Sequence, residues 1–316
     1  MTDTTTSGTK SFLLACPNCG HAFAAPLASP APRPSEALAS PRARRRPGLL
    51  DAVRWELTKL AAQGRARWTL LICLLAPILI VLVINAQQRP PKDNLYGRFI
   101  HESGFAVSLL VLGFAAQWLL PLLTALVAGD IFASEDQHGT WKTVLTRSAS
   151  RGQLFWAKTI TALGFATVVL LVLTLSTVLS SVLIVGHQDL TGLTGQAIGS
   201  STAGRLVVLS WLLALAPLIG FTCLAILLSV RSRNPAVGIA APVVIGMVMQ
   251  LAGSLGGIGA LRPLLLTTPF ESWHGLFAQD RFYAPLETGL VVSAAWSAAA
   301  LAAAYLLLRR RDITGG

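Results

Sequence analysis

One short stretch near the N-terminus has the residue types and spacing of a metal site. Cys16 and Cys19 lie in a Cys-Pro-Asn-Cys-Gly sequence, and His21 follows it. In a zinc ribbon, a tight turn of this kind points two thiolates at one ion, and a structural zinc takes four ligands. Cys16, Cys19 and His21 are therefore candidate zinc ligands, and a second copy of the chain would complete the set. The alternative is an unmetallated remnant in a flexible tail.

The same stretch also resembles a lipoprotein cleavage box, because Leu-Leu-Ala precedes Cys16. The apolar run before that cysteine covers only residues 12–15. A signal peptide needs an apolar region of about 7 to 15 residues. A lipoprotein signal is therefore excluded.

Motifs for nucleotide binding and hydrolysis are absent from the sequence. No Gly-x-x-x-x-Gly-Lys-Ser/Thr run occurs, so the chain has no phosphate loop for ATP. Neither His-Glu-x-x-His nor a glycine-flanked serine elbow occurs. Cys73 and Cys223 lie in apolar segments, and no disulfide framework is implied. We expect no catalytic residue, and no cofactor in the apolar part of the chain.

The composition indicates a protein that lies mostly in lipid. Of the 316 residues, 53% are hydrophobic and only 12% are charged. Crossing a bilayer takes roughly 20 consecutive apolar residues in a helix. Six segments meet this length: 68–86, 105–127, 159–184, 206–230, 235–255 and 290–308. The sequence therefore predicts an all-α integral membrane protein with six transmembrane helices.

The basic residues predict the orientation of these helices. Nineteen of the 25 Lys and Arg residues fall in the two termini and in the loops after the second and fourth spans, and six fall in the other loops. Basic residues concentrate on the cytoplasmic side of membrane proteins. We therefore expect a multi-pass protein of the plasma (inner) membrane, with both termini in the cytoplasm. The net charge of +11 is then mostly topological, and no nucleic-acid partner is expected.

The predicted spans contain no Asp, Glu, Lys, Arg or His in their interiors. A proton relay across lipid needs ionisable side chains, so a proton-coupled carrier is not expected. Gln117 and Gln250 are the polar groups that remain, and we interpret them as interhelical hydrogen-bond partners rather than substrate ligands.

Two regions precede the first span. Residues 1–48 are rich in Thr, Ser, Pro, Ala and Arg and are expected to be largely disordered. Residues 49–64 show an amphipathic period, with Leu50, Leu57 and Leu60 on one arc and Arg54 and Lys59 opposite. We expect an amphipathic helix that lies at the membrane interface and contacts lipid headgroups. The alternative is a simple extension of the first span.

The inner segment 130–158 lies between the second and third spans. Gly139 is expected to end the helix that leaves the membrane, and Thr140 to cap a short helix that ends at Arg147. Ser150 and Gln153 have the spacing of a capping box that starts the next helix. The resulting knob suits docking to a cytoplasmic partner.

The outer segment 256–288 is partly apolar and is broken by Pro263 and Pro269. It is too short to span the membrane twice. We expect a re-entrant or interfacial pair of short helices, whose backbone groups face protein or water. Residues 65–311 then form one six-helix domain, and residues 312–316 form a cytoplasmic tail.

The inner segment has a Glu-x-x-x-Gly-Thr sequence, then a short apolar stretch, an Arg, and a Lys at the start of the third span. These features are carried by Glu135, Gly139, Thr140, Leu145, Arg151 and Lys158. At this spacing the segment resembles a known family, the permease subunits of type-2 ABC exporters (ABC-2 type transporters). Gln137 and Ala149 depart from the family pattern, which often has Glu and Pro there. The resemblance extends from about Leu49 to Arg311.

The resemblance implies a permease that exports an apolar or amphipathic substrate. Such a subunit is not itself an enzyme, because a separate ABC ATPase subunit hydrolyses ATP. It pairs with a second permease copy or a paralogue, which makes a dimer. The segment 139–151 is then the coupling helix that docks on the ATPase. The residues implied in coupling are Glu135, Gly139, Thr140, Trp141, Lys142, Leu145, Arg147, Arg151 and Lys158.

A second interpretation remains open, a membrane protein that transports nothing. It is either an immunity protein that shields a membrane, or a metal or redox sensor that uses the Cys16–Cys19 motif. This interpretation predicts a functional chain without an ATPase companion.

Overall fold

The computed structural model describes residues 11–15, 22–26, 48–87, 96–139, 150–255 and 259–310. The chain forms two compact units, Met1–Arg46 and Pro47–Gly316. In the first unit, β1 (Ser11–Ala15) and β2 (Ala22–Pro26) pair as an antiparallel hairpin. Ser11 lies opposite Pro26, and Ala15 lies opposite Ala22. The sequence did not predict this hairpin.

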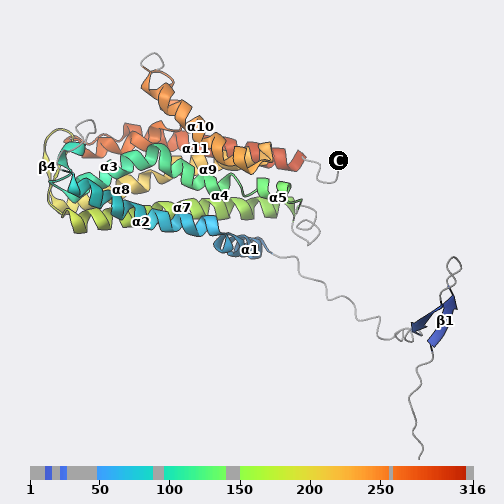
Figure 1. Cartoon of the computed structure of the whole chain (residues 1–316). Coiled ribbons are helices and arrows are strands. Elements are labelled where there is room, and N and C mark those ends of the chain that lie inside the picture. Colours follow the sequence, from blue (N-terminus) through green and yellow to red (C-terminus); the bar gives the residue numbers. More distant parts are fainter. Residues whose placement is uncertain are drawn as a thin grey trace, which may run out of the picture. The chain divides into compact units, whose positions relative to one another are not determined.

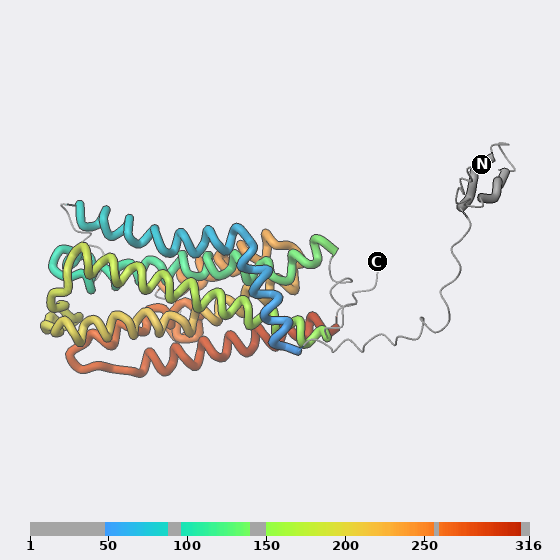
Figure 2. Tube along the Cα trace, turned by 90° about the horizontal axis from the view of Figure 1, so that it is seen from below, coloured from blue at the N-terminus to red at the C-terminus, as the bar shows by residue number. Residues whose placement is uncertain are grey.

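The second unit is a bundle of helices (Figures 1 and 2). Its elements, in chain order, are α1 (Leu49–Ala62), α2 (Gly64–Ala86), η1 (Gly97–Phe99), α3 (Gly104–Phe114), η2 (Ala115–Leu119), α4 (Leu120–Ala128), α5 (Ala133–Gln137), α7 (Arg151–Ile184), β3 (Leu190–Thr191), β4 (Ala197–Ile198), α8 (Ser200–Leu213), α9 (Leu215–Ser232), α10 (Pro235–Ser254), η4 (Arg262–Leu264), η5 (Thr268–Phe277) and α11 (Ala284–Arg310).

Six helical segments of this unit are long and apolar enough to cross a membrane, which confirms the predicted all-α membrane fold. They cover Gly64–Ala86, Gly104–Gln137, Arg151–Ile184, Ser200–Ser232, Pro235–Ser254 and Ala284–Arg310. The second segment joins α3, η2, α4 and α5, and the fourth joins α8 and α9. Each observed segment contains most of one predicted span.

The second and fourth segments form the centre of the bundle. Their most apolar windows are 61% and 67% buried, against 22% for α2, α10 and α11. The three peripheral helices expose large apolar side chains such as Leu79, Leu251 and Val291. A soluble monomer rarely exposes so much apolar surface, whereas a bilayer solvates it.

We name the two ends of the bundle by the elements found there (Figures 1 and 2). The α1 end carries α1, α5 and the C-terminal part of α11. The η5 end carries the β3–β4 hairpin and the short helices η4 and η5. Because α7 has 34 residues, at a rise of about 1.5 Å per residue it reaches roughly 51 Å from one end to the other.

Small residues allow α10 to cross α4 closely. A methyl group added to Gly238 of α10 would overlap the backbone carbonyl oxygen of Gly129, the residue that follows α4. Glycine at both positions therefore lets the two backbones touch, as small residues do at helix interfaces in membranes.

The second membrane segment is not a regular α-helix. Residues Ala115–Leu119 form a π-helical turn, in which the N–H of Leu120 donates to the carbonyl of Ala115. Pro121 follows directly and lacks the N–H that an α-helix would direct to the carbonyl of Gln117. The proline therefore favours the wider turn, which the sequence analysis did not anticipate.

A compact cap covers the η5 end. η4 and η5 are the short helices predicted before the last span. The N–H of Leu193 and the side-chain amide of Gln196 both donate to the carbonyl of Phe277, at 2.9 Å each. Tyr96 packs on Trp273 and on Phe277, with ring centroids 6.1 Å and 5.9 Å apart. Burial raises the pKa of the Tyr96 phenol above its usual range, so that this side chain stays protonated.

Candidate functional site

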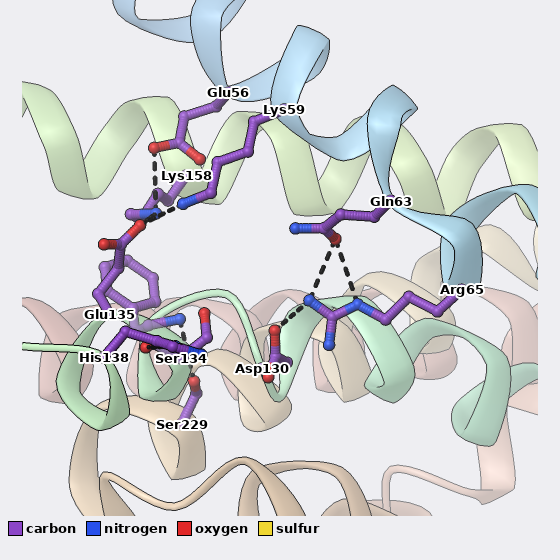
Figure 3. A network of polar contacts seen from close by, with 11 residues as sticks. Glu56, Lys59, Gln63, Arg65, Asp130, Ser134, Glu135, His138, Lys158 and Ser229 are labelled. Carbon is purple, nitrogen blue, oxygen red and sulfur yellow. Dashed lines mark hydrogen bonds and ion pairs between the residues drawn. The ribbon is translucent and has the colours of Figure 1, made fainter. Parts of the chain in front are cut away.

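A network of charged side chains lies at the α1 end, between α1, α5 and α7 (Figure 3). The Nζ of Lys158 on α7 lies 3.0 Å from a carboxylate oxygen of Glu56 and 3.1 Å from one of Glu135. Lys59 of α1 forms a second ion pair with Glu135. Glu135 is thus shared by two lysines, and Lys158 by two glutamates.

The network is neutral and mostly buried. It contains two carboxylates, of Glu56 and Glu135, and two ammonium groups, of Lys59 and Lys158. Lys158, Glu56 and Glu135 expose 3% of their surface or less, whereas the Lys59 side chain is 37% exposed. Burying charges is costly unless each meets an opposite charge. The ring of Phe132 also lies 6.0 Å below the Lys158 ammonium, in a cation–π contact.

Local structure explains why Glu135 and Lys158 meet. Gly139 has φ +63°, a left-handed conformation that ends α5. Ser150 accepts from the N–H of Gln153, and its own N–H donates to the Gln153 side chain. This pair is the predicted capping box, and it starts α7 at Arg151. The predicted end of α5 and the predicted start of α7 are thus confirmed. These two boundaries bring the C-terminal end of α5 and the N-terminal part of α7 together.

A second ion pair holds the junction of α1 and α2. Arg65, at the start of α2, pairs with Asp130, which follows α4. The side-chain oxygen of Gln63 accepts two hydrogen bonds from the same guanidinium, at 3.1 and 3.2 Å. Asp130 is 5% exposed, so this contact is also largely shielded from water.

α5 is anchored to the centre of the bundle as well. The hydroxyl of Ser229 on α9 accepts from the N–H of Phe132 at 3.2 Å and from that of Ala133 at 3.0 Å. These N–H groups are at the start of α5, where a helix has no internal acceptors for them. Ser229 therefore connects the end of the second membrane segment to the fourth.

The structure brings together only part of the predicted coupling set. Glu135 and Lys158 lie in the network, where neither is exposed to a partner. Arg151 lies at the surface of the α1 end, and its guanidinium donates to the carbonyl of Arg309 at 3.5 Å. Outside the described residues lie Thr140, Trp141, Lys142, Leu145 and Arg147, and also the candidate zinc ligands Cys16, Cys19 and His21.

Sequence reasoning did not single out Glu56 or Arg65, and it gave Lys59 no partner within the protein. The amphipathic pattern predicts that Lys59 faces lipid headgroups; the structure shows that it also pairs with Glu135. Leu50 and Leu57, on the predicted apolar arc, are exposed, and Leu60 is buried. The spacing of Glu56 and Lys59 could have indicated that both belong to one network, since residues three apart share one face of a helix.

The arrangement is suited to holding elements together. Each charge of the network meets an opposite charge, so none is left to attract a ligand. Within the described ranges, no group of three or more His, Cys, Asp and Glu side chains could hold a metal ion. The network holds α1 against the C-terminal end of α5 and the N-terminal part of α7.

Comparison with known proteins identifies the family. A family model described as ABC-2 family transporter protein matches residues 52–253. A search of curated proteins returned no match. The matched region takes in the α1–α5–α7 network and five of the six membrane segments. This chain therefore belongs to the ABC-2 family of transporter proteins.

Proposed function

We propose that this chain exports an apolar or amphipathic substrate. Its family makes it a membrane permease component of an ABC transporter. A separate ATPase subunit docks on the segment 139–151 and supplies the energy. The permease component is not itself catalytic, and the sequence has no phosphate loop of its own.

The observation that carries this proposal is the pairing of Glu135 with Lys158, 3.1 Å apart. These residues lie on either side of residues 139–151 in the chain and join the helices that flank it. A push on this segment therefore acts on α5 and α7 together. Because α7 runs through the whole bundle and Glu56 ties α1 to it, the push is passed on as a movement of rigid helices.

Partners and location follow from the same proposal. We place the α1 end in the cytoplasm of a plasma (inner) membrane protein, in agreement with the basic residues near it. A second permease, either a copy or a paralogue, covers part of the exposed apolar surface.

A pull-down from solubilised membranes tests the proposed partner. The tagged chain is expected to recover a phosphate-loop ATPase, and Arg151→Glu is expected to reduce that recovery strongly by reversing a charge beside the docking segment. Arg231→Glu is the matched control, since Arg231 is an exposed arginine at the end of α9. Wild-type recovery with Arg151→Glu would contradict the proposed docking site.

Recovery of the chain alone, stable and without ATPase activity, would favour the non-transporting alternative.

Metal analysis of the purified chain tests the proposed zinc site at Cys16, Cys19 and His21. Cys16→Ser and Cys19→Ser are expected to abolish stoichiometric zinc. A wild-type chain without zinc would end that proposal and leave the permease proposal unchanged.

A further inference from the structure

A cavity of about 300 Å³ opens between the second membrane segment, α10 and η5. This volume is at the lower end of the range for small-ligand sites. Its apolar lining comes mainly from Leu109, Phe114, Phe270 and Trp273. Its polar lining comes from Tyr96, Gln117, Gln250, Thr267, Glu271 and His274. The cavity is thus amphipathic, and it is separate from the network at the α1 end.

The π-helical turn supplies one polar group of this cavity. Gln117 lies in the middle of that turn, Ala115–Leu119. A π-helical turn is rare and occurs frequently at functional sites. Gln250 reaches the cavity from α10 and donates to Glu271 at 3.4 Å. Gln117 and Gln250, the two glutamines within the spans predicted from the sequence, therefore line one space.

Glu271 gives the cavity its charge. Among the described residues that line the cavity it is the only acidic one, and none of them is Lys or Arg. Arg262 lines a neighbouring cavity, and its Nη2 lies 3.2 Å from Glu271 Oε2. The side chains of Arg262 and Glu271 are 55% and 37% exposed, and such partly solvated ion pairs are weak. A second cation could therefore share or take over this carboxylate.

His274 adds an acceptor next to that carboxylate. Its Nδ1 lies 2.6 Å from the backbone carbonyl of Glu271, which can only accept, so Nδ1 carries the hydrogen. In the neutral ring, Nε2 is then an acceptor. The ring stacks on Trp273 with centroids 3.9 Å apart, which fixes its orientation. A carboxylate and an imidazole acceptor together favour a ligand that donates hydrogen bonds or carries positive charge.

The cavity lies beside an apolar surface. Phe114 and Trp118 on the second segment, and Val248 and Leu251 on α10, are all exposed. The C-terminal part of α10 leans away from the bundle (Figure 1). In a bilayer these side chains meet lipid tails, so a hydrocarbon chain can lie along them while its head group enters the cavity.

We propose that this cavity binds the cationic nitrogen head of an amphiphile, with Glu271 as its counter-ion. Gln117, Gln250 and His274 hold the head, and the tail lies between Phe114 and α10. Anionic heads are disfavoured, because the lining residues that the structure describes include a carboxylate and neither Lys nor Arg. That such an amphiphile is the exported cargo rests on the proposed function; its binding does not.

Direct binding to the full chain tests this proposal without an ATPase. The probe is radiolabelled hexadecylamine, whose protonated primary ammonium head carries both the charge and the N–H donors, and the chain is held in nanodiscs of neutral phospholipid. Saturable binding is expected, with hexadecyl sulfate, an anion with the same tail, binding much more weakly. Glu271→Gln should weaken binding of the cation about tenfold, the scale of one hydrogen-bonded charge contact.

Two further variants separate charge from structure. Arg262→Ala should strengthen binding of the cation, because it removes the competitor for Glu271, whereas a purely structural role would predict a loss. Glu287→Gln on α11, an exposed acid outside the cavity, should change nothing. Equal binding of the sulfate, an unchanged Glu271→Gln variant, or weaker binding in Arg262→Ala would overturn the proposal. ATPase recovery in the pull-down would be unaffected by any of these results, so the two proposals fail separately.

Discussion

Lys158 is the residue on which the buried network depends most. It pairs with both Glu56 and Glu135 and is 1% exposed. In Lys158→Ala, two carboxylates lose their shared partner inside the protein. Breaking a buried ion pair in this way costs about 3 to 5 kcal/mol. We expect a drop of several degrees in the melting temperature of the purified chain, measured by its loss of monodispersity on heating.

Lys59→Ala is the matched control, because its side chain is 37% exposed and Glu135 keeps Lys158. A partly solvated ion pair contributes about 1 kcal/mol or less, so only a small drop is expected. Equal drops in melting temperature for Lys158→Ala and Lys59→Ala would show that burial of a charged side chain does not determine how much it contributes to stability.

The sequence could predict some residues of this network and not others. Glu135 and Lys158 were singled out as coupling residues because they stand at the family spacing on either side of one loop, but their ion pair was not predicted. Glu56 and Asp130 were not found, because their partners are 102 and 65 positions away in the chain. Which charges meet across such separations depends on how α1 packs on α7, and local periodicity does not contain that information.

At the scale of elements, the crossing of α4 and α10 depends on two glycines. In Gly238→Ala, the new methyl group would overlap the carbonyl of Gly129, so the helices must separate or shift. Overpacking of this kind typically costs about 1 to 3 kcal/mol. We expect Gly238→Ala to lower the melting temperature and the yield of folded protein.

Gly164→Ala on α7 serves as the control for that variant. A methyl group at Gly164 meets nothing within 4 Å, and alanine is the better helix former by about 1 kcal/mol. It should therefore leave stability unchanged or raise it. Destabilisation by both substitutions to the same degree would rule out a close helix crossing as the cause.

Element boundaries were predictable where the signal was local. Ser150 with Gln153 starts α7, and Gly139 ends α5, as the capping and left-handed preferences of these residues predict. The π-helical turn was not predicted, although Pro121 disfavours an α-helix there. A proline in a membrane helix is compatible with a kink, a bulge or a break, and packing against neighbouring helices selects among them.

At the scale of the whole molecule, the network and the cavity lie toward opposite ends of the same helical bundle. The second membrane segment contains both Gln117, which lines the cavity, and Glu135, which belongs to the network. α7 extends from Lys158 near the α1 end to the η5 end. A movement that starts at the segment 139–151 therefore has a route along the chain, through α5, α4 and the π-helical turn, to the proposed ligand site.

The last prediction separates docking from transmission of this movement. Glu135→Gln keeps the shape of the side chain but removes the charge that Lys59 and Lys158 share. The ATPase should still be recovered at wild-type yield, because Glu135 is buried and does not reach the docking surface. The response of α1 to ATP should become smaller, because α1 loses its ion pair with α5 and keeps only the Glu56–Lys158 pair with α7.

That response can be measured in a chain whose four native cysteines are replaced by serine and whose exposed Arg54 is changed to cysteine. ATP should change the rate at which a water-soluble maleimide labels this cysteine in the complex, and the change should be clearly smaller with Glu135→Gln. Glu102→Gln, an exposed acid between η1 and α3, should retain it. If Glu135→Gln responded to ATP like the parent, the network would only stabilise the fold, and movement would have to pass from the docking segment through α7 alone.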